Sequence, residues 1–308
     1  MTRHFLEVDD LSADELDAVL TSAGAPHSAP GVGFEPVLAG RGVALLFEKP
    51  SARTRNSTEL AVFQLGGHPV SIRGEEVGLD TREPAEDLAR VLAGYHSIIC
   101  ARVVHHSSLV RMAAALDAAG MAVPVVNLLS DLAHPCQALA DLLTIRQHFG
   151  SARDVKVTYV GDGNNVCRSL ARACLLEGAR ISVACPPGYG LDQEEEAALH
   201  ALGAGFEAVV DPRAAVSDAD VVYTDVWASM GQEAEAEARL EAFDGYAVDA
   251  ELMSHASPKA IVMHCLPAHR GQEISAEVVD GPQSVVWQQA TNRMHAMRGL
   301  LAFLAAAD

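Results

Sequence analysis

The sequence contains few positively charged residues. Of its 308 residues, 22 are Lys or Arg and 41 are Asp or Glu, which gives a formal net charge of −19. Nucleic-acid backbones are bound by basic surfaces, so this balance argues against DNA or RNA as a partner. An acidic protein that binds a small phosphate must build a local positive region, which makes any group of arginines informative.

The sequence also lacks the patterns of a disulfide framework or a metal site. It has no CxxC pair, and His105, His106, His255 and His269 do not have metal-ligand spacing with the cysteines, so we expect no metal. We expect reduced thiols in a reducing compartment at all six cysteines, which are Cys100, Cys136, Cys167, Cys174, Cys185 and Cys265.

Long apolar runs are absent as well. No stretch approaches the roughly 20 apolar residues that cross a membrane, and the charged segment Met1–Glu7 lacks the apolar stretch of a signal peptide. We therefore expect a cytoplasmic protein with no membrane partner. At 308 residues and 49% hydrophobic composition, the chain is long enough for two domains of roughly 150 residues each.

Short β-rich apolar runs alternate with helical patterns along the sequence, which is typical of parallel sheets with crossover helices. We predict an α/β fold of two domains, each a mainly parallel sheet flanked by helices. One domain covers residues 1–134 with the terminal helix 291–308, the other covers 150–287, and helices such as 135–149 link them. Strands are predicted at 43–47, 69–72, 97–102, 124–127, 156–160, 180–185, 206–210, 220–224, 260–264 and 284–287. The acidic stretch 233–241 is predicted to be a solvated helix face.

The segment Phe47–Arg55 joins a predicted strand to a helix and places Arg53 and Arg55 in the first helical turn. A helix N-terminus already carries partial positive charge and unpaired N–H groups, so arginines are unfavourable there unless an anion binds. Ser51 can cap the helix and Thr54 adds a hydroxyl, which together predict a phosphate site. The alternative is a surface turn whose arginines pair with nearby carboxylates.

Polar residues follow several other predicted strands, where open parallel sheets bind their ligands. Arg102 ends one strand, and His134 and Gln137 share the face of a helix start, as a site or as a capping arrangement. The turn Gly161–Gly163 lacks the third glycine of a dinucleotide fingerprint, which argues against a nicotinamide cofactor. Trp227 and Trp287 are predicted to be packing residues.

Four strings of the sequence resemble the motifs of ornithine carbamoyltransferases, in their usual order and over essentially the whole chain. Members of that family usually have Ser-Thr-Arg-Thr-Arg, His-Pro-x-Gln, Asp-x-Trp-x-Ser-Met-Gly-Gln-Glu and His-Cys-Leu-Pro. The Ser-Met-Gly string distinguishes ornithine from aspartate carbamoyltransferases. The matching segments here are Ser51–Arg55, His134–Gln137, Asp225–Glu233 and His264–Pro267.

The resemblance implies that the chain transfers the carbamoyl group of carbamoyl phosphate to the δ-amine of L-ornithine, which gives L-citrulline and phosphate. It implies that Arg102 bridges the phosphate and the carbonyl oxygen, that His134 and Thr54 polarise the carbonyl, and that Arg293 closes over the ligand. Gln137 and the Leu266 backbone would hold the carbamoyl amide. The phosphate would be bound by Ser51, Ala52, Arg53, Thr54 and Arg55.

The resemblance also implies the residues for ornithine. Its α-amino and carboxylate groups would meet Asn165, Asp225, Ser229 and Met230, and its δ-nitrogen would lie beside Cys265. Attack needs a neutral amine, which an apolar pocket favours by desolvation. Cys265 is therefore interpreted as a partner of the amine and not as a covalent nucleophile, because direct attack needs no acyl-enzyme.

Family resemblance further implies a homotrimer without a cofactor, with sites at subunit interfaces. Two positions depart from the usual pattern. Ala52 replaces a Thr, which removes a hydroxyl. Glu76 matches a position near which relatives commonly have a Gln or His that reaches the neighbouring subunit's site. A carboxylate there would repel phosphate, so Glu76 must turn away, pair with an arginine or be protonated. The alternatives to ornithine transfer are carbamoyl transfer to another amine, a non-catalytic binding homologue and a dehydrogenase.

Overall fold

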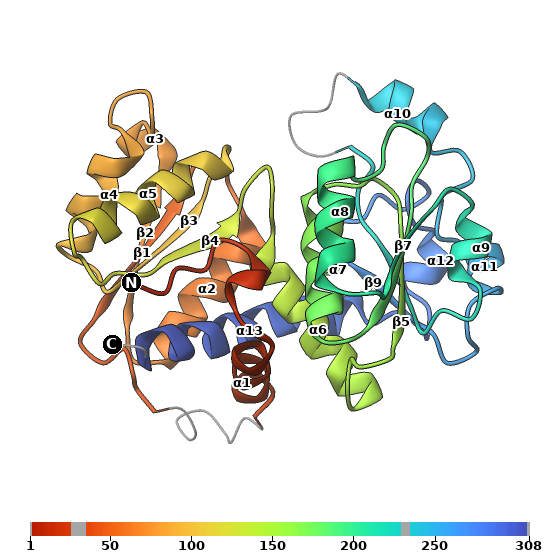
Figure 1. Cartoon of the computed structure of the whole chain (residues 1–308), viewed down its shortest axis with the longest axis horizontal. Helices are drawn as coiled ribbons and strands as arrows, with labels where there is room; N and C mark the ends of the chain where they lie inside the picture. Colours follow the sequence, from red (N-terminus) through yellow and green to blue (C-terminus); the bar gives the residue numbers. More distant parts are fainter. Residues whose placement is uncertain (1, 26–34, 229–234, 307–308) are drawn as a thin grey trace. The chain divides into compact units, whose positions relative to one another are not determined.

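The computed structural model of the protein describes residues 2–25, 35–228 and 235–306. The chain forms two compact units, Met1–Leu143 with Thr291–Asp308 and Thr144–Ala290, and each contains one parallel sheet (Figure 1). The predicted α/β fold with two parallel sheets is therefore confirmed. No helix within the described ranges is long and apolar enough to cross a membrane.

The first unit contains a four-stranded sheet in the order β2-β1-β3-β4. Phe47, the last residue of β1, pairs with Arg73 at the end of β2 and with Arg102 at the end of β3, so the carboxyl ends of these strands coincide. The strands are β1 (Gly42–Phe47), β2 (His68–Arg73), β3 (Ile98–Arg102) and β4 (Val125–Leu129). The helical segments are η1 (Val8–Asp10), α1 (Ala13–Gly24), α2 (Ala52–Gln64), α3 (Gly74–Val77), α4 (Ala85–Ala93) and α5 (His106–Ala118).

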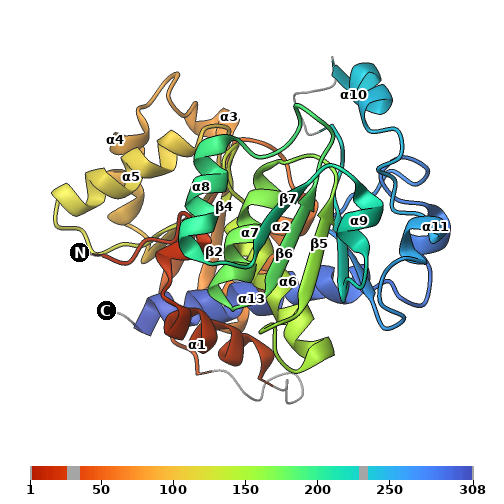
Figure 2. The same cartoon turned by 45° about the vertical axis from the view of Figure 1, so that its right-hand side comes forward.

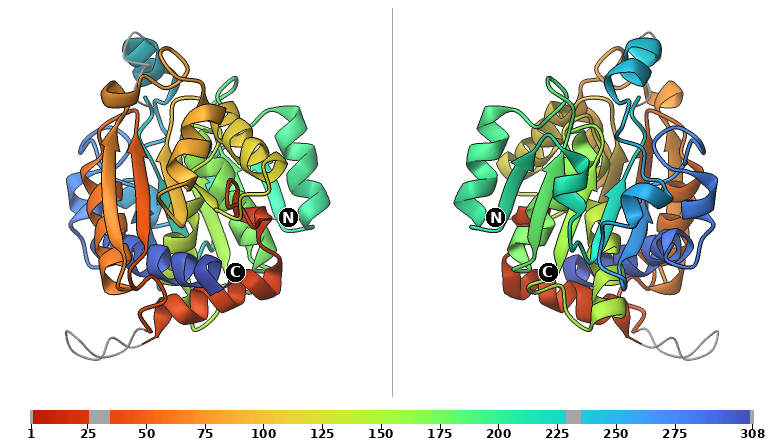
Figure 3. Two further views of the ribbon diagram at one scale, coloured as in Figure 1. Left: turned by 90° about the vertical axis from the view of Figure 1, so that its left-hand side faces the viewer. Right: turned by 90° about the vertical axis from the view of Figure 1, so that its right-hand side faces the viewer.

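Helices cover both faces of this sheet, which explains why its strands are apolar along their length. Figure 3 shows α4 and α5 on one face, where Leu88 and Leu109 pack against Leu46 and Ile99. Helices α1, α2 and the last helix of the chain, α13 (Val286–Ala306), lie on the other face. Gly299 of α13 lies so close to α1 that a Cβ atom there would be 2.5 Å from the Val19 carbonyl oxygen.

The second unit contains a five-stranded sheet in the order β7-β6-β5-β8-β9. Its strands are β5 (Lys156–Val160), β6 (Arg180–Ala184), β7 (Phe206–Val209), β8 (Val221–Thr224) and β9 (Ile261–His264). Its helices are α7 (Asn165–Leu176), α8 (Gln193–Leu202), α9 (Pro212–Val216), α10 (Ala236–Ala242), α11 (Ala250–Met253) and α12 (Ala276–Val279). The strand order reverses between β5 and β8, which is the position where such sheets bind ligands.

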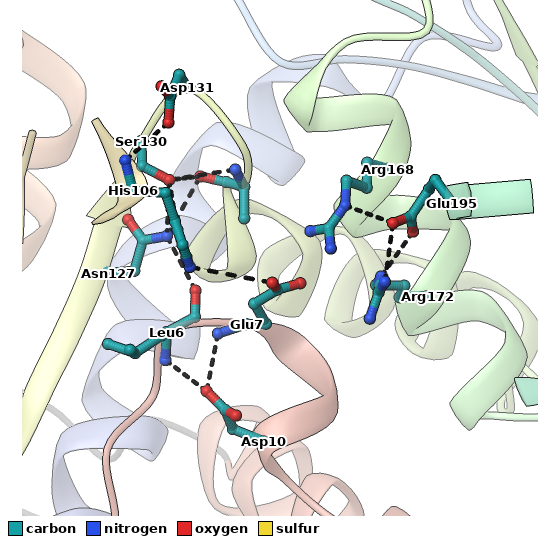
Figure 4. Close-up of polar contacts among 11 residues, drawn as sticks. Leu6, Glu7, Asp10, His106, Asn127, Ser130, Asp131, Arg168, Arg172 and Glu195 are labelled. Atoms are coloured by element: carbon teal, nitrogen blue, oxygen red, sulfur yellow. Dashed lines mark hydrogen bonds and ion pairs between the residues drawn. The ribbon is translucent and has the colours of Figure 1, made fainter. Parts of the chain in front are cut away.

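Helices also cover both faces of the second sheet (Figure 2). On one face, α7 and α8 are joined by the buried Glu195 carboxylate, which accepts hydrogen bonds from Arg168 and Arg172 at 2.7 Å each (Figure 4). On the other face, a core cluster joins α9, α11 and α12 to the strands and includes Trp227, Phe243 and Val279. The chain passes between the units within two continuous helices, α6 (Pro135–Phe149) and α13.

One predicted strand is wrong. Residues 284–287 do not form a strand, because α13 begins at Val286, five residues before the predicted start at Thr291. Only a single bridge joins Ser284 to Val262 of β9. The apolar run of Val285, Val286 and Trp287 was ambiguous, since short apolar runs fit a strand or a helix equally well. The other nine strands lie within two residues of their predicted ends.

Candidate active site

The start of α2 lies directly after the carboxyl end of β1. Ser51 is its N-cap residue, and its hydroxyl accepts a hydrogen bond from the Thr54 backbone N–H at 3.3 Å. Ala52 and Arg53 are exposed in the first turn, whereas the Thr54 side chain is buried. No acidic residue occupies this turn, so the positive end of the helix and the Arg53 guanidinium act together on an approaching anion.

A buried guanidinium joins three distant parts of the first unit. Arg293 of α13 donates a hydrogen bond from Nη2 to the Thr54 hydroxyl at 2.9 Å and another from Nη1 to the Gln137 side-chain carbonyl. The Gln137 amide in turn donates to Asp141 at 2.8 Å. Arg293, Thr54 and Gln137 are each at most 5% exposed, so their charge and hydrogen bonds are largely shielded from water.

Arg102 and His134 complete this group. Arg102 ends β3 and His134 precedes α6, and both side chains are buried. Burial lowers the pKa of His134 well below its ordinary value, and the positive charges of Arg293, Arg102 and Arg53 lower it further. The His134 ring is therefore neutral at pH 7. It can donate a hydrogen bond through one ring nitrogen without adding a buried charge.

Arg55 is arranged differently from Arg53. Its Nε donates to Glu59 Oε1 at 3.0 Å, one helical turn further along α2. The Ser71 hydroxyl donates to the same oxygen, and this bond, followed by that from Arg55, lowers the pKa of Glu59. The carboxylate pairing that the sequence left open as an alternative is thus present for Arg55. The positive charge of Arg53 instead helps to lower the pKa of His134.

Glu76 lies in the short helix α3. Its carboxylate accepts a hydrogen bond from the Arg73 backbone N–H at 3.1 Å and so caps its own helix. The side chain is exposed. Of the arrangements that the sequence allowed for this carboxylate, the described contact is with a backbone N–H and not with an arginine side chain.

In the second unit, Asp225 lies at the point where the strand order reverses. It follows β8, is buried, and accepts a hydrogen bond from the Asn164 side chain at 3.1 Å. Burial raises the pKa of Asp225, and the nearby His264 and the hydrogen bonds from Val226 and Asn164 oppose that rise. Asn165, which the sequence analysis selected, is the half-buried first residue of α7.

Asn164 is a residue that the sequence analysis missed. It is the N-cap of α7, and its side-chain oxygen accepts hydrogen bonds from the backbone N–H groups of Val166 and Cys167 at 2.9 and 3.1 Å. Because these bonds fix the side-chain oxygen, the amide nitrogen is directed toward Asp225. The preference of Asn for helix N-caps was the available signal, since the first of two consecutive asparagines precedes the helix.

Arg239 of α10 was also missed. Its buried guanidinium lies 3.0 Å from Asp162 in the turn after β5 and donates to the Trp227 carbonyl oxygen at 2.8 Å. It also lies 5.1 Å from the centre of the Tyr189 ring. Arg239 thereby holds the beginning of the Asp225–Glu233 segment. Two predicted site residues of that segment, Ser229 and Met230, lie outside the described residues.

The His264–Pro267 segment begins at the last residue of β9. The Leu266 backbone N–H donates to His264 Nδ1 at 2.8 Å, so the opposite ring nitrogen, Nε2, donates to the buried Glu273 carboxylate at 3.1 Å. Leu266 has a φ of 60°, an unfavourable value for a residue with a Cβ atom. Cys265 is half-buried, and its side chain is a reduced thiol, like those of the other five cysteines.

The predicted site residues thus form one group within each unit. In the first unit the structure brings Thr54, Gln137 and Arg293 into direct contact, with Arg102 and His134 in the same charged environment. In the second unit Asp225 and the His264–Pro267 segment lie at the carboxyl ends of neighbouring strands, β8 and β9. Within the described ranges, no group of three or more His, Cys, Asp or Glu side chains is arranged to hold a metal ion.

The chain is similar to known proteins over most of its length. The carbamoyl-phosphate-binding domain of the aspartate/ornithine carbamoyltransferase family matches residues 3–147, and the aspartate/ornithine-binding domain of that family matches residues 153–304. The chain therefore belongs to the aspartate/ornithine carbamoyltransferase family.

Within that family, the chain is similar over its length to ornithine carbamoyltransferases. It is 50% identical over 311 residues to that of a Parafrankia species, covering 98% of this chain and 96% of the relative. It is 47% identical over 302 residues to that of Haloquadratum walsbyi, covering 98% and 97%. Among solved structures, the ornithine carbamoyltransferase of Pyrococcus furiosus has a TM-score of 0.91 and 43% identity, covering 99% of this chain and 98% of that one.

Proposed function

We propose that this chain is an ornithine carbamoyltransferase, which transfers the carbamoyl group of carbamoyl phosphate to the δ-nitrogen of L-ornithine and releases L-citrulline and phosphate. The observation that carries the proposal is the buried contact of Arg293 with Thr54 and Gln137, close to Arg102 and a neutral His134. Buried cationic donors at the carboxyl ends of parallel strands suit a small phosphate with an attached amide.

Carbamoyl phosphate binds to the first unit in this proposal. Ser51, Arg53, Thr54 and the N-terminal backbone N–H groups of α2, including that of Ala52, hold the phosphate. Arg102 spans the phosphate and the carbonyl oxygen. Because Arg55 is bonded to Glu59, it borders this site and contributes less to the phosphate than Arg53 does.

The carbonyl group of the ligand is activated by hydrogen-bond donors. Attack on the carbon places negative charge on the oxygen, and donors already directed at that oxygen stabilise the charge, with one such donor typically worth about 3 kcal/mol. His134, Arg102 and the Thr54 hydroxyl supply these donors. The Gln137 side-chain carbonyl and the Leu266 carbonyl accept from the carbamoyl amide. The Leu266 N–H is already bonded to His264, which leaves its carbonyl for this role.

Ornithine binds to the second unit in this proposal. The Asp225 carboxylate, directed by Asn164, receives the α-ammonium group, and Asn165 contacts the α-carboxylate. Ser229 and Met230 belong to the same motif. The δ-nitrogen meets the Cys265 thiol, which orients the amine without bonding to the carbamoyl group.

The reaction follows directly. The lone pair of the neutral δ-nitrogen forms the new C–N bond, and the carbonyl becomes a tetrahedral oxyanion. The oxyanion then re-forms the carbonyl as the C–O bond to phosphate breaks, the electrons of that bond leave with the phosphate, and the departing phosphate takes up the proton that the nitrogen releases. Holding the two reacting atoms in contact supplies much of the acceleration.

We further propose that the chain acts as a cytoplasmic homotrimer, in which the segment that contains Glu76 reaches the site of a neighbouring subunit. The exposure of Leu60 and Phe63 on α2, 50% and 70%, supports an interface at that helix. Sedimentation equilibrium tests the assembly, and a monomer that is fully active would overturn it.

The activity is tested with the purified protein, carbamoyl phosphate and a panel of amines that contains L-ornithine, putrescine, N-acetylornithine and L-aspartate. Mass spectrometry identifies the carbamoylated products against a protein-free control. We expect citrulline as the main product. Faster carbamoylation of another amine would overturn the choice of ornithine, and absence of any protein-dependent product would overturn the enzymatic assignment.

A further inference from the structure

Glu48 connects two strand ends that border the proposed phosphate site. It is the first residue after β1, three residues before Ser51. Its backbone N–H donates to the Arg102 carbonyl oxygen at 2.9 Å, which continues the pairing of β1 with β3 by one step. Its carboxylate oxygen Oε2 accepts from the Val104 backbone N–H at 2.7 Å. Glu48 thus bonds to both ends of the Arg102–Val104 segment, on the side that continues the pairing of β3 with β1.

The second bond replaces a step of the strand ladder. In a parallel pair, the Val104 N–H would next meet the main-chain carbonyl of Glu48. Here the side-chain carboxylate accepts that bond. The chain after β1 can therefore leave the sheet at Lys49 and Pro50 and enter α2, while the segment after β3 keeps a partner.

The opposite side of the same segment is held by the residues after β4. The Val103 N–H donates to the Leu129 carbonyl oxygen at 3.0 Å, and the Asp131 N–H donates to the Val104 carbonyl oxygen at 3.1 Å. The Asp131 carboxylate accepts from the His106 backbone N–H at 2.8 Å (Figure 4). These residues lead into His134. The segments that hold Ser51, Arg102 and His134 are therefore fixed to one another.

We propose that Glu48 is a positioning residue for carbamoyl phosphate, which holds the Arg102 segment against the start of α2 through its carboxylate. This inference rests on the function proposed above. Glu48 acts through the backbone of the segment and does not touch the ligand. The backbone of Gly74, the first residue of α3, packs against it, since a Cβ atom at Gly74 would lie 2.7 Å from the Glu48 Cα atom.

The charge and the hydrogen bond of Glu48 have opposite effects on an anionic ligand. A carboxylate close to a phosphate site repels the phosphate, so its charge alone weakens binding. Its hydrogen bond orders the segment that contains Arg102, and so strengthens binding. Replacement by Gln removes the charge and keeps an acceptor oxygen, whereas replacement by Ala removes both. The two variants therefore separate the two effects.

The test measures carbamoyl phosphate affinity by isothermal titration without ornithine for the wild type, Glu48→Gln, Glu48→Ala and a control, Glu15→Ala. Glu15 has a matching carboxylate bond, since it accepts from the Ser12 backbone N–H at 2.8 Å at the start of α1. We expect Glu48→Ala to bind about tenfold more weakly, which is the scale of one lost hydrogen bond. Glu48→Gln should bind at least as tightly as the wild type, and Glu15→Ala should be unchanged.

Steady-state kinetics supply a second readout, in which Glu48→Ala should raise the KM for carbamoyl phosphate and leave the KM for ornithine within about twofold. Tighter binding by both Glu48 variants would show that only the charge matters, and unchanged binding by Glu48→Ala would remove the role altogether. If Glu48→Ala does not fold, weaker binding by Glu48→Gln than by the wild type overturns the proposal. If the wild type binds and turns over both substrates, the proposed function stands even where the Glu48 results overturn the role of Glu48. If the wild type does not bind carbamoyl phosphate, both the proposed function and the role of Glu48 are overturned.

Discussion

The Nη2 atom of Arg293 lies 2.9 Å from the hydroxyl of Thr54, although 239 positions separate the two residues in the sequence. The second nitrogen of the same guanidinium donates to Gln137. A planar fork with two donors in fixed directions makes both bonds at once. The last helix of the chain therefore takes part in the site built at the starts of α2 and α6.

Replacing Arg293 by Lys should weaken carbamoyl phosphate binding by about 2 kcal/mol, because an ammonium group cannot reproduce the fork and each bond to a charged donor is worth about 1.5–3 kcal/mol. Isothermal titration measures the loss. Arg146→Lys is the control, since Arg146 makes a comparable two-nitrogen contact with Glu177 in the second unit. Equal affinity in Arg293→Lys and the wild type would contradict the assigned role.

Arg53 and Arg55 should differ although both stand at the start of α2. We expect Arg53→Ala to weaken carbamoyl phosphate binding by about 2 kcal/mol or more, as for a lost charged hydrogen bond. Arg55→Ala should have a smaller effect, because Arg55 is bonded to Glu59. Titrations of the two variants side by side give the comparison. A larger loss in Arg55→Ala would mean that its bond to Glu59 breaks when the ligand binds.

Asp225→Asn should raise the KM for ornithine by at least about tenfold, the scale of one lost charge-assisted bond, and should leave carbamoyl phosphate affinity within about twofold. The reason is that the variant loses the carboxylate charge and places an amide opposite the Asn164 side chain. Initial-rate kinetics with each substrate varied in turn measure both effects. Similar losses for the two substrates would indicate a general disturbance of the fold.

Cys265→Ser should keep measurable turnover, because direct attack by the amine needs no bond to sulfur. The ornithine dependence should worsen, since a hydroxyl differs from a thiol in size and acidity. Rapid quenching of the wild-type reaction followed by peptide mass spectrometry supplies the direct check. A carbamoyl group found on Cys265 during turnover would rule out this role.

The free energy of unfolding should fall with acidity partly because of His134. Its folded-state pKa lies well below the ordinary value of 6.5, so below about pH 6.5 the unfolded chain takes up a proton that the folded chain does not. Each pH unit then costs about 1.4 kcal/mol until the folded-state pKa is reached. Urea unfolding at pH 7.5 and 5.5 should show a smaller difference for His134→Gln than for the wild type. An unchanged difference in His134→Gln would refute the prediction.

Apolar periodicity located the strands well because a strand buried on both faces must be apolar along its length. The prediction of a strand at 284–287 was wrong because the run of Val285 and Val286 fits a helix start equally well. Only the neighbouring residues decide which of the two forms. The site residues came from motif resemblance together with their positions at strand ends. The N-cap geometry of α7 decides that the Asn164 side chain bonds to Asp225, and the sequence alone does not show this geometry. The direction of the Arg55 side chain on α2 likewise decides its pairing with Glu59. Arg239 gave no signal in the sequence, because an arginine in an acidic helix is ordinarily a surface residue.

The path of α13 has a consequence for synthesis. The first unit is completed only by the last residues of the chain, where Arg298 is 1% exposed and donates to Gln64, and Gly299 packs closely against α1. Domains usually fold in the order in which they leave the ribosome. Here the second unit is fully translated first, while the first unit must wait for α13. A premature stop shortly before Arg298 would leave the older part of the polypeptide unfinished and exposed to aggregation and proteolysis.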